Sequence, residues 1–219
     1  MIIAVICTLL AVITYFKWYD WWPQNYTEEN HYERLMAGNA RFANGHPRHP
    51  GESLKHRTSV AHAQRPFALI ITCSDSRVCP ELIFDQGLGD IFVIRTAGNI
   101  ISEIEMGSIE YAVEHLGVRF IGVMGHQNCG AIHALMEESD FPGHIHSIID
   151  SLKTEIEIQP ALEHHNLDEA IVANISHQVT SIMNDPLIAT LKNSAKLDIF
   201  GMYYSLESGQ VKITDSLKL

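Results

Sequence analysis

Three short runs of apolar residues restrict the possible folds of this chain more than any other feature. They span residues 67–72, 91–94 and 120–124, and none shows the alternation of polar and apolar residues typical of a strand with one solvent-exposed face. Runs of this length and composition are typical of strands buried on both faces. We therefore expect a β-sheet that is covered by helices on its two sides.

The segments between these runs predict how the strands connect. Apolar residues recur at helical spacing over residues 109–116, and Ser102 and Glu105 have the spacing of a capping box at the start of that helix. Strands separated by helices favour parallel pairing through right-handed crossovers. The sequence therefore predicts an α/β fold with a central, mainly parallel β-sheet flanked by helices.

Capping residues, apolar spacing and turn residues predict the remaining elements. The last two of them should be a strand and its hairpin partner, which would extend the sheet near the end of the chain. We expect helices from Thr27 to near Gly45 and over residues 60–64, 130–138, 147–157 and 168–184, and strands over residues 197–204 and 210–214.

The amino terminus has a different character. Residues 1–16 contain no charged side chain, and residues 17–22 hold an aromatic cluster of the kind found at membrane interfaces. A helix over the first stretch would span about 24 Å, slightly less than a bilayer core. The segment lacks the basic start and small-residue cleavage site of a secretory signal. We expect residues 1–22 to be a hydrophobic anchor helix or signal-like segment of a membrane-anchored or exported protein, with one domain over residues 23–219. The alternative is a buried helix in a cytoplasmic protein.

Charge and cysteine content exclude two classes of protein. The chain has 26 acidic and 15 basic residues, a formal net charge of -11, and no dense run of Lys or Arg. Nucleic acid is therefore not expected as a partner. Four cysteines in 219 residues are too few for a disulfide scaffold.

Two polar motifs directly follow buried strands. Cys73-Ser74-Asp75-Ser76-Arg77 comes after the first strand, and His126-Gln127-Asn128-Cys129-Gly130 comes after the third. The carboxyl ends of parallel strands are where open α/β sheets place their ligands. Cys73, Asp75, His126 and Cys129 can therefore converge on one ion, and two thiolates with an imidazole and a carboxylate suit Zn²⁺.

The residues beside these ligands favour a catalytic over a structural zinc site. A structural site would be closed by a further ligand, for which Cys79 is the nearby candidate. Arg77 can instead hold the Asp75 carboxylate by a bidentate, charge-assisted contact. When Asp75 is held off the metal, water can take the fourth position, where Zn²⁺ lowers its pKa to about 7.

These motifs resemble those of the β-class carbonic anhydrases, over about residues 32–214. The resemblance implies a zinc enzyme that interconverts CO2 and bicarbonate by attack of zinc-bound hydroxide. It also implies a parallel sheet, an N-terminal helix packed on a partner subunit, and an active site near the interface of a homodimer or homotetramer. Besides the two cysteine motifs, it rests on Leu35–Phe42 (LMAGNARF), Pro80–Gly87 (PELIFDQG), Arg95–Asn99 (RTAGN) and Ser108–Val113 (SIEYAV).

The resemblance also implies a role for each matching residue. The metal ligands would be Cys73, His126 and Cys129, with Asp75 joining them only in a closed, inactive state. In the open state Asp75 would accept a hydrogen bond from the zinc hydroxide while Arg77 keeps it off the metal. The substrate would be bound by the Gln64 amide and the Gly130 backbone N–H, beside an apolar wall formed by Phe92, Ala97 and Tyr111.

The residues at positions 70 and 72 indicate whether the metal site is open or closed in the resting enzyme. A subgroup of the family is shut down by bicarbonate at a second site, which a Trp three residues before the first Cys and a Gly directly before it help to form. This chain has Ile70 and Thr72 there. We therefore expect the open, water-bound state at neutral pH, without strong inhibition by bicarbonate.

Three other functions are compatible with the motifs. A hydrolase of CS2 or COS would keep the same metal site and change the substrate. A membrane-tethered zinc-binding scaffold would keep the metal without turnover. A redox protein would join Cys73 and Cys129 in a disulfide and carry no zinc.

Overall fold

A five-stranded sheet forms the centre of the fold. The computed structural model describes residues 31–137, 141–154, 158–195 and 197–215. Its strands lie in the order β2-β1-β3-β4-β5; the first four are parallel, and β5 is antiparallel to β4. The mainly parallel sheet and the closing hairpin are therefore confirmed. The strands are β1 Ala68–Cys73, β2 Ile91–Thr96, β3 Phe120–His126, β4 Asp198–Tyr204 and β5 Val211–Asp215.

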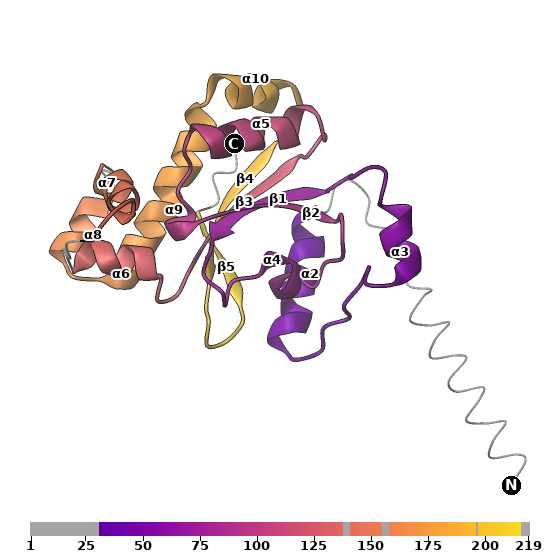
Figure 1. Cartoon of the computed structure of the whole chain (residues 1–219), viewed down its shortest axis with the longest axis horizontal. Coiled ribbons are helices and arrows are strands. Elements are labelled where there is room, and N and C mark those ends of the chain that lie inside the picture. Colours follow the sequence, from indigo (N-terminus) through magenta and orange to yellow (C-terminus); the bar gives the residue numbers. More distant parts are fainter. Residues whose placement is uncertain (1–30, 138–140, 155–157, 196, 216–219) are drawn as a thin grey trace, which may run out of the picture. The chain divides into compact units, whose positions relative to one another are not determined.

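Helices cover both faces of the sheet. In Figure 1, α5, α9 and α10 lie on one side of the strands, and α2 and α4 lie on the other. The capping box at Ser102 and Glu105 is formed at the start of α5, as expected. The helices are α2 His31–Ala43, α3 Leu54–Ser59, α4 Pro80–Ile83, α5 Glu103–Glu114, α6 Gly130–Met136, α7 Ile145–Lys153, α8 Gln159–Glu163, α9 Leu167–Asn184 and α10 Pro186–Ala195, with the 3₁₀ turn η2 at Ala97–Asn99.

Side-chain alternation along β1 divides the core into two layers. Leu69, Ile71 and Cys73 belong to the apolar cluster on the side of α5 and α9. Ala68 and Ile70 belong to the cluster on the side of α2 and α4. All six residues of β1 are buried, as the unbroken apolar run predicts. The alternation places the side chain of Cys73 in the same layer as α9.

Several helices differ from the sequence-based expectation. The helix predicted at 60–64 is wrong: the chain forms α3 earlier, because the Ser53 hydroxyl accepts a hydrogen bond from His56 N (3.1 Å) and caps its start. The helix predicted at 147–157 begins earlier, as α7, and residues 155–157 lie outside the described ranges. Three helices were not predicted, α4, α8 and α10, and each has a proline at its start. Proline is tolerated there because the first turn needs no N–H donor.

The predicted anchor over residues 1–22 lies outside the described residues, as do residues 27–30 of the first expected helix. Among the helices that are described, none is both long enough and apolar enough to cross a membrane.

Candidate metal centre

The two cysteine motifs meet at the point where the strand order reverses. The chain passes from β1 to β2 on one side of β1, and β3 lies on its other side. In sheets of this kind, ligands bind beyond the carboxyl ends of the strands at that reversal. Cys73 is the last residue of β1 and His126 is the last residue of β3, so both stand at this position.

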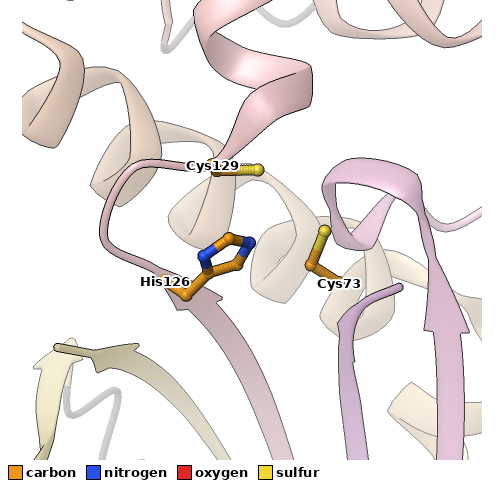
Figure 2. Close-up of side chains that lie close together, drawn as sticks. All are labelled: Cys73, His126 and Cys129. Carbon is orange, nitrogen blue, oxygen red and sulfur yellow. The ribbon is translucent and has the colours of Figure 1, made fainter. Parts of the chain in front are cut away.

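Three side chains converge there. Cys73, His126 and Cys129 are buried, and their possible ligand atoms all lie within 4.8 Å of one another. Figure 2 shows the two sulfur atoms and the imidazole facing a common point. Cys129 reaches this point because Asn128 adopts a left-handed backbone conformation (φ 55°) and turns the chain back before α6 begins.

The imidazole of His126 is oriented as a metal ligand. Its Nδ1 lies 2.9 Å from the carbonyl oxygen of Gln127. A carbonyl can only accept a hydrogen bond, so Nδ1 carries the proton and Nε2 presents a lone pair to the sulfur atoms. Nε2 is buried and has no hydrogen-bond partner among the described residues. A buried, unpartnered acceptor between two cysteine sulfurs is explained by a metal ion.

One of the two sulfur atoms, that of Cys73, carries negative charge before any metal binds. A hydrogen bond from the Cys129 side chain lowers the pKa of Cys73 to about 4, against the opposing effect of burial. The same contact, together with burial, raises the pKa of Cys129. Cys73 is therefore a thiolate at neutral pH, and its charge favours a bound cation. The donor set of two sulfurs and one imidazole nitrogen fits Zn²⁺.

Arg77 holds Asp75 in place at the edge of the cluster. The Arg77 guanidinium donates two hydrogen bonds, from Nε to Oδ1 (2.9 Å) and from Nη2 to Oδ2 (2.7 Å) of Asp75, and the Arg77 backbone N–H donates to Oδ1 (2.9 Å). These contacts hold the pKa of Asp75 well below its usual range. Asp75 Oδ2 lies 4.0 Å from His126 Nε2. The carboxylate is thus ionised and adjacent to the three ligands.

The family relationship follows from this site and from comparison with known proteins. The family model described as carbonic anhydrase matches residues 68–211, a segment that contains the whole cluster with Asp75 and Arg77. The chain belongs to the β-class of carbonic anhydrases. It therefore belongs to a family of enzymes that interconvert CO2 and bicarbonate.

Several β-carbonic anhydrases and curated carbonic anhydrases are similar along most of their length. The carbonic anhydrase of Mycolicibacterium smegmatis is 38% identical over 191 residues, covering 85% of this chain and 93% of the relative. Carbonic anhydrase 2 of Mycobacterium tuberculosis is 36% identical over 191 residues, covering 85% and 92%. The solved structure of the β-carbonic anhydrase CcaA has a TM-score of 0.69 at 32% identity, covering 84% of this chain and 95% of that one.

The loop after β2 contacts the carbonic anhydrase site in a way that sequence reasoning missed. The backbone N–H of Gly98 donates a hydrogen bond to Cys73 Sγ (3.4 Å). Arg95 donates from Nε to the carbonyl oxygen of Cys73 (3.3 Å) and from Nη2 to that of Asp75 (2.9 Å). The matching stretch Arg95–Asn99 marks this loop in the sequence, but its function became visible only from these contacts.

The residues expected to bind substrate are not all brought to the cluster of one chain. Gly130 is exposed, and among the described residues no atom outside its chain neighbours and its own helix backbone lies within 4 Å of the position that a Cβ would occupy there. Ala97 directly precedes Gly98 at the cluster. By contrast, Phe92 lies four residues before Thr96, which pairs with Cys73 between β1 and β2. Four residues correspond to about 13 Å along a strand. The Phe92 ring packs near that of Tyr111, with 6.5 Å between centroids.

Gln64 was expected to bind substrate through its side-chain amide. It is exposed in the segment between α3 and β1, and no hydrogen bond links it to the cluster in the described part of the chain. Its contact with substrate, like that of Phe92 and Tyr111, stays a prediction.

Cys79 does not join the metal ligands. Its thiol donates to Glu81 Oε2 (3.4 Å), and the group of possible ligands found among the described residues consists of Cys73, His126 and Cys129. Cys73 and Cys129 are free thiols, and so is Cys79. The structure thus shows neither closure of the site by Cys79 nor the disulfide of the redox alternative.

Proposed function

We propose that Cys73, His126 and Cys129 hold one Zn²⁺ and that the chain catalyses the reversible hydration of CO2 to bicarbonate and a proton. The observation that carries this proposal is the buried, negatively charged Cys–His–Cys cluster beside a carboxylate fixed by Arg77. When bound, Zn²⁺ supplies a Lewis acid that lowers the pKa of a coordinated water to about 7, a value typical of zinc enzymes of this kind.

Asp75 contacts the attacking water, and Arg77 acts by holding Asp75. Asp75 is ionised and can only accept hydrogen bonds, so it orients a water whose O–H points toward its carboxylate. Arg77 occupies both carboxylate oxygens and keeps Asp75 from turning into the cluster. This arrangement supports the open state as the resting state at neutral pH. Thr72, which stands where the bicarbonate-inhibited subgroup has glycine, is buried and donates to the Met124 carbonyl oxygen (2.7 Å).

The substrate site is completed by a second copy of the chain in this proposal. Gly130 offers a backbone N–H and Ala97 a small apolar surface beside the cluster, whereas Phe92 lies about 13 Å along the strand from the level of Cys73 and Tyr111 packs near Phe92. Tyr111 is 45% exposed and packs against Phe92 on the free edge of the sheet. An aromatic pair formed by Phe92 of the edge strand β2 and the exposed Tyr111 of α5 can serve as the apolar wall for CO2 in a neighbouring subunit.

A homo-oligomer is therefore part of the proposal, as a homodimer or homotetramer. Two β-carbonic anhydrases of Sordaria macrospora are tetrameric, and the matching structure is 26% identical with a TM-score of 0.69. Light scattering on the purified chain after size exclusion should give a mass of two or four protomers. A monomer that hydrates CO2 at full rate would contradict the shared site.

We also propose that residues 1–22 attach the enzyme to a membrane, so that it is membrane-anchored or exported. The uncharged stretch over 1–16 and the aromatic cluster after it support this. The full chain should remain in the membrane fraction after carbonate washing, whereas a chain beginning at residue 23 should be released. Equal release of both chains would favour the cytoplasmic alternative.

Stopped-flow hydration of CO2, with zinc per chain measured on the same sample, tests the main proposal. We expect about one zinc per chain and fast hydration. Cys73→Ser should lose most of the zinc, and Asp75→Asn should keep the zinc and lose most of the activity. A fully zinc-loaded chain without hydration would reject the proposal and direct attention to CS2, COS and the scaffold function.

A further inference from the structure

Two buried amide side chains lie on the apolar face of α9. Asn174 is 1% exposed and Gln178 is 3% exposed, one helical turn apart. Their neighbours on that face are apolar and buried, including Ile175 and Val179. Burying an amide among apolar side chains is unfavourable unless its donors and acceptors are hydrogen-bonded. The pair therefore needs partners, and the structure provides them outside the helix.

The two amides form a chain of hydrogen bonds to the loop after β2. Gln178 Oε1 accepts from the backbone N–H of Ile101 (3.0 Å), and Gln178 Nε2 donates to Asn174 Oδ1 (3.1 Å). Asn174 Nδ2 donates to the carbonyl oxygen of Gly98 (2.9 Å). The pair thus holds the loop at two backbone positions, three residues apart.

This loop carries the N–H that contacts a metal ligand. Gly98 donates to Cys73 Sγ (3.4 Å) from a left-handed backbone conformation (φ 70°). A Cβ at Gly98 would lie 3.1 Å from the Ala131 Cβ, so the loop also packs closely against α6. The direction of the Gly98 N–H therefore depends on how the loop is held between α6 and α9.

We propose that Asn174 and Gln178 are positioning residues for the metal centre, acting through Gly98 on the sulfur of Cys73. The inference rests on the proposed metal site. An N–H directed at a thiolate reduces the electron density that the sulfur donates and fixes its orientation toward the ion. Loss of a hydrogen bond to a metal ligand commonly lowers metal affinity by about 10-fold to 100-fold.

Two near-isosteric variants test this link in the full-length chain. Asn174→Asp keeps the acceptor for Gln178 Nε2. It replaces the N–H donor to the Gly98 carbonyl oxygen by a carboxylate oxygen, which cannot donate, so that hydrogen bond is lost. Gln178→Glu keeps the acceptor for Ile101 N and removes the donor to Asn174. Val179→Ala is the matched control, because it removes buried volume from the same helix and changes none of these hydrogen bonds.

The readouts are the affinity for Zn²⁺ in competition with a chromophoric chelator and the thiolate-to-metal charge-transfer band of the Co²⁺-substituted protein. We expect Asn174→Asp to weaken Zn²⁺ binding about 10-fold and to move the Co²⁺ band to longer wavelength, with a smaller change of the same sign in Gln178→Glu. Val179→Ala should lower the melting temperature and leave affinity and band unchanged.

The opposite pattern would overturn the inference. If both amide variants lower the melting temperature as Val179→Ala does, but keep wild-type affinity and the wild-type band, the pair only stabilises the fold. If Asn174→Asp does not fold, Gln178→Glu decides by the same two readouts. A wild-type chain that binds neither ion would overturn the metal centre as well as this link.

Discussion

Asn39 connects three parts of the chain that are distant in sequence, and removing its side chain should lower the stability of the domain. It is 3% exposed on α2. Its Nδ2 donates to the carbonyl oxygens of Ile83 (3.2 Å) and Gly209 (2.8 Å), and its Oδ1 accepts from the backbone N–H of Val211 (2.9 Å). The side chain therefore ties α2 to the end of α4 and to the β4–β5 hairpin.

The magnitude follows from the number of bonds lost. A hydrogen bond contributes about 1 kcal/mol net, and a buried backbone group left without a partner costs about 1–3 kcal/mol. Asn39→Ala removes three bonds to backbone groups, so we expect the free energy of unfolding to fall by about 3 kcal/mol. Asn39→Asp keeps the acceptor for Val211 N and loses both donors, so about 2 kcal/mol or more should be lost.

Urea unfolding followed by circular dichroism measures this change. Protein and zinc concentrations are held equal between variants, since both ligand binding and oligomerisation shift the apparent stability. The midpoint should fall with an unchanged m-value. Asn44→Ala is the control: Asn44 is exposed just after α2, and within the described part of the chain its side chain bonds only to the Ala40 carbonyl oxygen (2.7 Å), so the variant should change stability by less than about 0.5 kcal/mol. If Asn39→Ala changes stability no more than Asn44→Ala, the reasoning is refuted.

Three further predictions concern the site and the packing of the helices. Arg77→Ala should lower kcat/KM by about 100-fold or more with full zinc content, because Asp75 loses its orientation; unchanged steady-state kinetics would contradict this role. Because Arg77 keeps the pKa of Asp75 well below its usual range, Asp75 stays ionised, and CO2 hydration rates at pH 7 and pH 8.5 should agree within about a factor of two in stopped-flow assays, the difference expected from a zinc-bound water with a pKa of about 7; a collapse at pH 7 would indicate a closed site. Gly38→Ala should destabilise the domain by about 3 kcal/mol in chemical unfolding, because its Cβ would lie 1.7 Å from the carbonyl oxygen of Phe84. Gly107→Ala, where nothing lies within 4 Å, should leave stability equal or slightly higher; equal losses in the two variants would show that the close approach is not the cause.

Helix starts show where local patterns succeed and fail. The capping box at Ser102 and Glu105 was predicted because both partners lie within one turn. The helices beginning at Pro80 and Pro186 were missed because proline can either start or interrupt a helix, and the residue itself does not show which. For α10, the Asp185 carboxylate accepts from the N–H groups of Leu187 (3.0 Å) and Ile188 (2.9 Å), which makes the proline a suitable first residue.

The roles of buried polar residues were harder to predict. Asn174 and Gln178 recur at helical spacing on an apolar face, and this is the one signal in the sequence that could have marked them. Their partners lie 76 and 77 residues away along the chain. A pattern within one helix indicates that an amide is buried, but it does not show which backbone group satisfies it.

The sequence by itself determined the buried character of the first three strands and the chemistry of the metal ligands. Both depend on short-range information: an apolar run predicts burial on two faces, and Cys, His and Asp limit the ions that can bind. The contact between Asp75 and Arg77 was predictable for the same reason, because only Ser76 separates them in the chain.

Only the tertiary structure decided which strand ends meet. Cys73 faces His126 because β3 pairs with β1 on the side opposite β2, and this order depends on how helices far apart in sequence pack on the sheet. The same order leaves Phe92 on the free edge strand β2, about 13 Å along the strand from the level of Cys73. Strand order depends on contacts between segments that are distant in sequence, because whole faces of the sheet must be buried under helices. Local sequence patterns do not contain this information.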